Sequence, residues 1–363
     1  MSSVLFFDPN CQTPYSRRTL DEAALGGTEA SVARVAEAID ATVMQHNRTV
    51  AEERFLPPGN ASHVRHLVIL RDPRTVRSLS ERFPGARLYL WMHDLLRPGS
   101  KRGRRLAAAA PTLAELSVTV VCVSDFQRYQ VEAVLRGAGV EGRVRAVTVY
   151  NPVDDALAPN GESVDPAKLV FFSSPNKGLA LTLDAFQAVR RALPDVRLCV
   201  GSPGYKSLRR AGMQSVDGGI DGVEWLGALP HARILSEVRT ALCVFYPNVV
   251  LAETFGLVLA EAKAVGTPVL THDFGAAAEV LADPRQTLPV TAALRWYERT
   301  AGMLPGAARR RVAPWAARLG LFEPYIERVR AWREGERPLT QPDPRFRLSA
   351  VAERWRALFA GDA

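Results

Sequence analysis

Two glutamates, Glu253 and Glu261, flank the predicted start of a helix, with seven residues between them. The apolar run 242–246 predicts a buried strand, and the pattern over 257–264, followed by Gly266, predicts a helix. Glu253 then lies in the connecting loop and Glu261 on the helix. A helix N-terminus gathers unpaired amides and the positive end of the helix dipole, so it suits a phosphate group. We expect four amides to face such a ligand, those of Phe255, Gly256, Leu257 and Val258.

The whole stretch 247–269 carries more information than the two glutamates. A bare pair at this spacing is better explained by a loop surface charge and a solvated helix position, because glutamate is common. The run ETFGLVLAEA followed by GTPV, however, resembles the donor-site motif of the retaining GT-B glycosyltransferases of family 4. In that family the first glutamate lies against the transferred sugar and the second hydrogen-bonds the ribose of the nucleotide. The resemblance assigns these roles to Glu253 and Glu261.

Lys177 is a second candidate for chemistry, because it precedes Gly178 in a predicted turn between a strand and a helix. A lysine there is placed to neutralise phosphate as a point charge. The resembling family has an arginine a few residues before this Lys-Gly pair, and both cations hold the donor diphosphate. This chain has Phe172 and Ser173 where the arginine is expected, which leaves open what replaces it. We expect Ser173 or Ser174 to donate hydrogen bonds to the same phosphate.

Two further candidates lie in the first half of the chain. His93 follows the predicted strand 87–91 and is the only one of the six histidines that we place at the carboxyl end of a strand, where open α/β sheets bind ligands. Gly26 and Gly27 open a predicted helix, where glycine permits close approach of a ligand. Alone, these are a structural histidine and an ordinary turn. In the resembling family the corresponding His-Asp contacts the donor sugar, and the G-G-x-E turn lies over the donor phosphates and beside the acceptor.

Strands and helices alternate along all 363 residues, which predicts an α/β protein with two doubly wound parallel-sheet domains. The resemblance implies the GT-B fold, in which two Rossmann-like domains face a cleft. We expect residues 1–155 to form the acceptor-side domain and residues 156–340 to form the domain that binds the nucleotide sugar. Residues 341–363 would form a C-terminal helix that crosses back to the first domain.

Composition sets looser bounds. The balance of 46 basic and 38 acidic residues, a net charge of +8, suits nucleic acid, an anionic membrane face or anionic nucleotides, and identifies none of them. Apolar runs are shorter than the roughly 18 residues of a membrane span, no signal peptide is evident, and the four cysteines lack metal-binding spacing. We therefore expect a cytoplasmic protein. No Asp-x-Asp with a metal role is evident, so we expect neither metal nor cofactor.

The segment RPGSKRGRR, residues 97–105, has five basic residues and no acid. One interpretation is that it attracts an anionic acceptor, such as a lipid-linked diphosphate, or the anionic leaflet that carries it. The protein would then associate peripherally with the cytoplasmic face of the membrane. The other interpretation is a solvated basic loop without a partner. The residues concerned are Lys101, Arg102, Arg104 and Arg105.

These features predict a retaining, metal-independent, hexosyltransferase-like glycosyltransferase that moves a sugar from a nucleotide-diphosphate sugar to a glycan, lipid-linked or small-molecule acceptor. The sequence does not determine the base, sugar, acceptor, linkage or oligomeric state. Two alternatives remain: a degenerate GT-B protein that only binds a nucleotide, and a protein that glycosylates or binds nucleic acid. The presence of Glu253, Glu261 and Lys177 argues against the first. The second lacks a basic motif interleaved with aromatic residues, so we do not favour nucleic acid.

Overall fold

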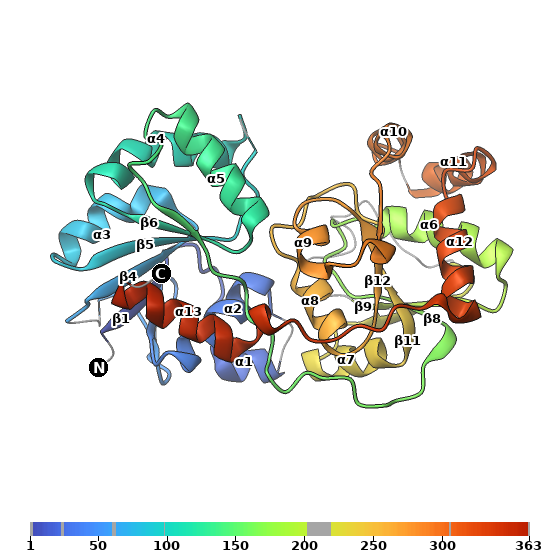
Figure 1. Ribbon diagram of the computed structural model, residues 1–363, viewed down its shortest axis with the longest axis horizontal. Coiled ribbons are helices and arrows are strands. Elements are labelled where there is room, and N and C mark those ends of the chain that lie inside the picture. Colours follow the sequence, from blue (N-terminus) through green and yellow to red (C-terminus); the bar gives the residue numbers. More distant parts are fainter. Residues whose placement is uncertain are drawn as a thin grey trace. The chain divides into compact units, whose positions relative to one another are not determined.

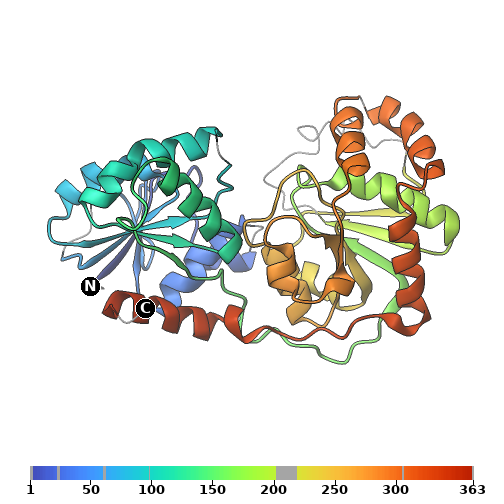
Figure 2. The ribbon, with the colours of Figure 1, turned by 45° about the horizontal axis from the view of Figure 1, so that its top comes forward.

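The structure, a computed structural model, describes residues 3–22, 25–59, 63–97, 99–201, 219–304 and 306–361. The chain divides into two compact units. Each unit has a parallel β-sheet with helices packed on it (Figures 1 and 2), which confirms the predicted fold class. The first unit comprises Met1–Leu20, Gly27–Asp155 and Pro344–Ala363, and the second comprises Asp21–Gly26 and Ala156–Asp343.

The sheet of the first unit has seven strands in the order β3-β2-β1-β4-β5-β6-β7. The direction of winding reverses between β1 and β4, and in open parallel sheets ligands bind outside the carboxyl ends of the strands at such a point. The residues that follow β1, β4 and the neighbouring β5 therefore lie where a ligand of this unit is expected to bind. The strands are β1 (Val4–Asp8), β2 (Thr42–Gln45), β3 (Phe55–Leu56), β4 (His66–Leu70), β5 (Arg87–Met92), β6 (Thr119–Cys122) and β7 (Ala146–Thr148).

The last helix of the chain completes the core of the first unit, where it packs on α2 (Figure 1). Trp355 on this helix is fully buried, and its ring lies 5.7 Å from Phe6 and 5.0 Å from Trp91. The helices of this unit are α1 (Arg17–Glu22), α2 (Gly27–Ala38), η1 (Pro73–Thr75), α3 (Val76–Arg82), α4 (Lys101–Glu115), α5 (Asp125–Gly137), η5 (Pro344–Phe346) and α13 (Leu348–Ala360).

The sheet of the second unit has six strands in the order β10-β9-β8-β11-β12-β13. Here the winding reverses between β8 and β11, which pair in parallel, with Leu169 opposite Cys243. Their carboxyl ends meet at one edge, so the loops that follow these two strands are neighbours. The strands are β8 (Asp165–Phe171), β9 (Arg197–Gly201), β10 (Val223–Gly227), β11 (Ala241–Phe245), β12 (Val269–His272) and β13 (Thr287–Leu288).

A buried ion cluster attaches the late helices of the second unit to α6. The guanidinium of Arg309 donates to Asp184 at 2.7 Å and to Glu298 at 2.6 Å, and the Tyr297 hydroxyl donates to Asp184 at 2.8 Å. Within the described ranges, every helix is too short or too polar to pass through a lipid bilayer. The helices are α6 (Leu179–Ala192), α7 (His231–Arg239), α8 (Leu257–Ala264), α9 (Ala277–Leu281), η3 (Pro284–Gln286), α10 (Ala292–Ala301), α11 (Gly306–Arg318), α12 (Glu323–Ala331) and η4 (Trp332–Glu336).

Candidate functional site

The structure pairs two of the predicted site residues directly. The Lys177 ammonium, in the turn after β8, lies 3.0 Å and 2.8 Å from the two carboxylate oxygens of Glu253, in the loop after β11. The Tyr246 hydroxyl donates to Oε1 of the same carboxylate at 2.6 Å. Glu253 is only 3% exposed, and an unpaired carboxylate at that depth would cost several kcal/mol. The two donors compensate for that cost, while the Lys177 side chain stays 35% exposed.

Tyr246 is a site residue that the sequence analysis missed. Burial raises the pKa of Tyr246 well above its ordinary value, so the hydroxyl stays protonated and donates to Glu253. The same hydroxyl lies 3.3 Å from Nδ2 of Asn248, which donates to it. The signal in the sequence was a tyrosine directly at the end of the strand that leads into the glutamate motif.

Two glycines allow neighbouring loops to approach the loop that carries Glu253: Gly178 lies in the turn of Lys177, and Gly275 lies in the loop after β12. Gly178 has φ of 96°, and a Cβ at this position would lie 2.5 Å from the carbonyl oxygen of Pro247. Gly275 has φ of 81°, and a Cβ there would collide with the backbone of Glu253. Both positions therefore require glycine for conformation and for space. The Lys-Gly pair seen in the sequence thus has a steric reason as well as an electrostatic one.

The predicted helix after Glu253 is confirmed, since α8 begins at Leu257. Gly256 caps it with φ of 91°, a left-handed conformation that glycine adopts without strain. The Phe255 side chain is buried and anchors the turn in the core. Amides in the first turn of a helix, here those of Leu257 and Val258, have no acceptor within the helix. Whether they hold a phosphate stays a prediction.

Glu261 lies on α8, one turn beyond these amides, and is buried rather than solvated. Its Oε1 atom lies 3.0 Å from Nε2 of His231, the first residue of α7. The two atoms lie within ion-pair distance, but Nε2 makes no hydrogen bond within the part of the chain that the structure describes. The sequence analysis missed His231, because it opens a helix far from the motif in the chain and lies beside Glu261 only in the fold.

We predicted that His93 is the only histidine at the carboxyl end of a strand. This prediction was wrong, because His272 lies at the carboxyl end of β12. His272 is the last residue of β12. Its Nδ1 accepts from the Asn248 amide at 3.3 Å, so the ring proton is on Nε2, which lies 3.0 Å from the Tyr325 hydroxyl. Burial lowers the pKa of His272 to about 4. This neutral imidazole fixes the loop that carries Glu253.

Ser173, where the arginine is expected, and the neighbouring Ser174 are both buried. The Ser174 hydroxyl donates to Oδ1 of Asn176 at 2.6 Å, and the Ser173 hydroxyl lies 3.5 Å from the Tyr246 hydroxyl. Both serines therefore line the turn that presents Lys177. Their hydrogen bonds to a phosphate stay a prediction.

In the first unit, His93 directly follows β5 and is 8% exposed. Burial, reinforced by the charge of Arg71, lowers the pKa of His93 to about 3. The imidazole is therefore neutral at physiological pH and can contribute a hydrogen bond but no charge. The adjacent Asp94 is held by Arg71 through two hydrogen bonds of 2.9 Å and 2.8 Å. The sequence analysis missed this arginine, which directly follows β4.

The glycine pair lies at the start of α2, as predicted, with Gly27 as its first residue. The Ser31 hydroxyl donates to the carbonyl of Gly27 at 2.8 Å and closes the first turn. Gly26 belongs to the second of the two compact units. The role of both glycines toward a ligand stays a prediction.

The basic segment is not the loop that one interpretation assumed, because α4 begins at Lys101. Ser100 caps this helix by accepting from the Gly103 amide at 3.0 Å. Four basic residues thus occupy the first turns of a helix, where the dipole disfavours cations. Arg102 compensates by lying 3.2 Å from Asp94, and Arg104 donates to the carbonyl of Gly99. Pro98 of this segment lies outside the described residues.

Metal ligands do not gather in the described part of the chain. Among these residues, no group of three or more His, Cys, Asp or Glu side chains could hold a metal ion. The four cysteines are buried and unpaired.

Comparison with known proteins agrees with this geometry. Residues 160–288 match the family model of the glycosyl transferases group 1. Phosphatidyl-myo-inositol mannosyltransferase of Mycobacterium leprae is 33% identical over 147 residues, covering 36% of this chain and 38% of that protein. D-inositol 3-phosphate glycosyltransferase of Segniliparus rotundus is 32% identical over 173 residues, covering 45% of this chain and 38% of that protein. The chain thus spans under half the length of these relatives.

Solved structures cover the whole chain at low identity. Anabaena Alr3699/HepE in complex with UDP superposes with a TM-score of 0.65 and 15% identity, over 99% of both chains. Sucrose-phosphate synthase from Thermosynechococcus elongatus superposes with a TM-score of 0.60 and 17% identity, again over 99% of both.

The fold is that of the GT-B glycosyltransferases. Within that class the chain resembles family 4 over the segment that carries Lys177, Glu253 and Glu261, which confirms the resemblance drawn from the sequence.

The buried imidazole of His272 generates a prediction about acid stability. Its pKa is about 4 in the folded state and near 6.5 when unfolded, so only the unfolded chain takes up this proton between these values. We expect this imidazole alone to lower the free energy of unfolding by about 1.4 kcal/mol per pH unit as pH decreases through this window. Urea titrations at several pH values should show a shallower fall for His272→Gln.

The difference in slope between the parent and His272→Gln measures the contribution of the imidazole alone. Burial raises the pKa of Asp184 to about 6, which has the opposite effect on stability, but Asp184 titrates in both proteins. Identical slopes for the parent and His272→Gln would contradict a neutral, buried imidazole.

Proposed function

We propose that the protein is a retaining glycosyltransferase that uses a nucleoside-diphosphate sugar as donor. The observation that carries this proposal is the buried carboxylate of Glu253, held by Lys177 and Tyr246 immediately before the N-terminus of α8. A buried carboxylate beside an exposed ammonium and a helix N-terminus offers one group for sugar hydroxyls and two for phosphate. Glu261, on the same helix, would accept hydrogen bonds from the ribose.

The proposed chemistry is electrostatic. Charge develops on the leaving diphosphate as the bond to the anomeric carbon breaks, and donors already in place stabilise that charge without reorganisation. Lys177 would supply one positive charge and the first-turn amides of α8 would supply partial ones. We assign no general base and no metal, since in the resembling family the leaving phosphate itself takes the proton of the acceptor.

Nucleoside diphosphates are the ligand class that the neighbours support. Alr3699/HepE has been solved in complex with UDP and with UDP-glucose. We therefore propose a nucleotide-diphosphate sugar as the donor of this chain, with no resident cofactor. The names of the relatives, which include a phosphatidyl-myo-inositol mannosyltransferase and an inositol phosphate glycosyltransferase, support a lipid-linked or other anionic acceptor.

We further propose that the basic first turns of α4 attract this acceptor, or the anionic leaflet that carries it, so that the protein works at the cytoplasmic face of a membrane. Lys101, Arg102 and Arg104 are exposed. Charges near such a surface contribute about 1 kcal/mol each, and the effect fades within a Debye length.

Replacing Glu261 is expected to affect mainly nucleotide binding, whereas replacing Glu253 is expected to affect mainly turnover. Glu261→Ala should weaken binding of the nucleoside diphosphate whatever the sugar, since each charge-assisted hydrogen bond lost is worth about 1.5–3 kcal/mol, roughly 10- to 100-fold in affinity. Glu253→Ala should lower turnover of the sugar nucleotide more than binding of the bare diphosphate. Calorimetric titration and steady-state kinetics on both variants measure the two effects. Equal losses in both assays would contradict the division of roles.

Turnover should survive removal of divalent ions. The proposed charge stabilisers are Lys177 and backbone amides, so an assay in excess EDTA should retain most of the activity. A complete loss of activity that is restored by adding a divalent ion would show that a metal neutralises the diphosphate.

The α4 proposal is tested by replacing Lys101, Arg102, Arg104 and Arg105 together with serine. The variant should bind anionic vesicles more weakly than the parent at low salt, because up to four attractive charges are lost. Its affinity for nucleoside diphosphate should be unchanged. Vesicle binding equal to that of the parent would refute a role of α4 at the membrane and favour a soluble acceptor.

A further inference from the structure

Exposed apolar side chains concentrate in one short part of the second unit. The described chain has ten exposed large hydrophobic residues, and six of them fall within residues 296–319, the region of α10 and α11. Single exposed apolar residues are normal on protein surfaces, whereas a concentration of them marks an interaction site. The six residues are Trp296, Met303, Leu304, Val312, Trp315 and Leu319.

The exposed residues of α11 share one face. Val312, Trp315 and Leu319 follow at intervals of three and four, which places them along one stripe of a helix. The Leu319 amide still donates to the Trp315 carbonyl at 3.1 Å, so the helical path continues to this residue. The exposed fractions are 38%, 65% and 86% respectively. Ala313 and Ala316, on the adjoining face of the helix, are buried, so the stripe is an outer surface of a packed helix.

The same region is strongly basic. Residues 292–320 contain six arginines and a single acid, Glu298. That acid is neutralised by the buried Arg309, whose guanidinium lies 2.6 Å from it. The guanidinium of Arg318 lies 5.0 Å from the Trp315 ring centroid, so charge and apolar surface adjoin. Five exposed arginines remain around the apolar residues, namely Arg295, Arg299, Arg310, Arg311 and Arg318.

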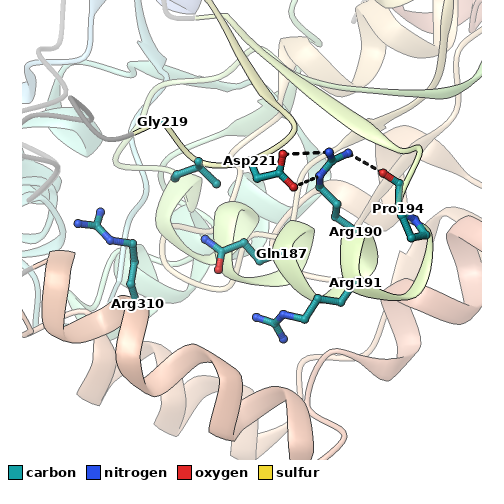
Figure 3. Close-up of a pocket in the computed structure, with 8 residues that line it drawn as sticks. Gln187, Arg190, Arg191, Pro194, Gly219, Asp221 and Arg310 are labelled. Atoms are coloured by element: carbon teal, nitrogen blue, oxygen red, sulfur yellow. Dashed lines mark hydrogen bonds and ion pairs between the residues drawn. The ribbon is translucent and has the colours of Figure 1, made fainter.

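A pocket of about 600 Å³ between α6 and α11 adds a place for an anion. Figure 3 shows Gln187 between Arg191 and Arg310 in its lining. Arg190 is engaged by Asp221, at 2.7 Å and 3.0 Å. Among the described residues, Arg191 and Arg310 have neither an ion pair nor a hydrogen bond. Two unneutralised guanidiniums at one pocket suit a phosphate group.

We propose that α10 and α11 dock on the surface of an anionic lipid bilayer. Tryptophan at a bilayer interface buries its ring while its N–H stays wet, and leucine, valine and methionine enter the acyl boundary. Arginines beside them reach headgroup phosphates, with Arg191 and Arg310 holding one of these at the pocket. The face is polar at its charged rim and apolar along its stripe, which is the pattern of helices that lie in a membrane interface.

Charge decides between this occupant and others. A second copy of the chain would present the same arginines, and like charges would repel. A single-stranded nucleic acid would stack on the two tryptophans, but the aliphatic Val312 and Leu319 offer it no stacking surface. An anionic bilayer uses both the aliphatic and the charged residues. The proposal involves none of the donor-site residues, so it can be tested independently of the glycosyltransferase activity.

The test uses vesicles of phosphatidylcholine with about one third phosphatidylglycerol, at low ionic strength where surface charge is least screened. The parent protein should co-sediment with these vesicles and not with pure phosphatidylcholine. The triple variant Trp296→Ser, Trp315→Ser, Leu319→Ser should bind at least about tenfold more weakly, since three large apolar groups no longer leave water. The matched control, Val50→Ser with Leu339→Ser, removes equally exposed apolar groups elsewhere and should bind like the parent.

A second readout locates the contact. Brominated lipid should quench the fluorescence of the parent and quench the triple variant far less. Of the four tryptophans that remain, Trp91, Trp332 and Trp355 are buried, and Trp225 is half-buried and lies outside α10 and α11. Replacing Arg191 and Arg310 with serine should weaken binding and reduce its dependence on salt. Absence of vesicle binding in the parent would overturn the proposal, as would equal binding by the parent and the triple variant. Loss of vesicle binding in the α4 variant but not in the triple variant would also overturn the proposal. So would a parent that self-associates without binding vesicles, if the triple variant loses that self-association.

Discussion

A carboxylate buried at the edge of a parallel sheet is the constraint on which the candidate site depends. Glu253 is almost completely removed from water, so it needs charge compensation within hydrogen-bonding distance. Lys177 provides it from the turn after β8 and Tyr246 from the end of β11. Losing either donor would leave the carboxylate under-compensated. The pair therefore links two loops that are far apart in the sequence, and the position of each depends on the other.

The sheet brings the loops of Lys177 and Glu253 side by side, and two glycines allow close packing around Glu253. Because β8 and β11 are parallel neighbours at the point where the winding reverses, their following loops emerge side by side. Gly178 and Gly275 then let backbone approach backbone where any Cβ would collide. His272 holds the Asn248 amide from β12, so a third strand fixes the loop. A charged group at this site is thus held by rigid elements on several sides.

Sequence patterns predicted the alternating strands, the start of α8 and the resemblance to family 4, because each of these depends on local periodicity or on a contiguous motif. Contacts between residues that are far apart in the sequence could not be predicted from such patterns. His231 meets Glu261 only after α7 and α8 pack together, and Arg71 meets Asp94 only across adjacent strands. The helical period of α11 is hard to recognise in the sequence because the helix contains Pro314 and a run of arginines. Its order comes from the buried contact of Arg309 with Asp184.

We propose that Lys177 and the first-turn amides of α8, beside the buried Glu253, receive the diphosphate of a donor. The most direct measurement is the thermal unfolding of the protein with a panel of nucleoside diphosphates and the matching phosphate-free nucleosides, since a ligand that binds the folded state raises the midpoint. We predict that at least one diphosphate raises the midpoint and that its nucleoside does so far less. In Lys177→Met combined with Glu253→Gln, which removes both charges together, the diphosphate shift should largely disappear. Stabilisation of this double variant equal to that of the parent, or no stabilisation of the parent by any diphosphate, would contradict the claim.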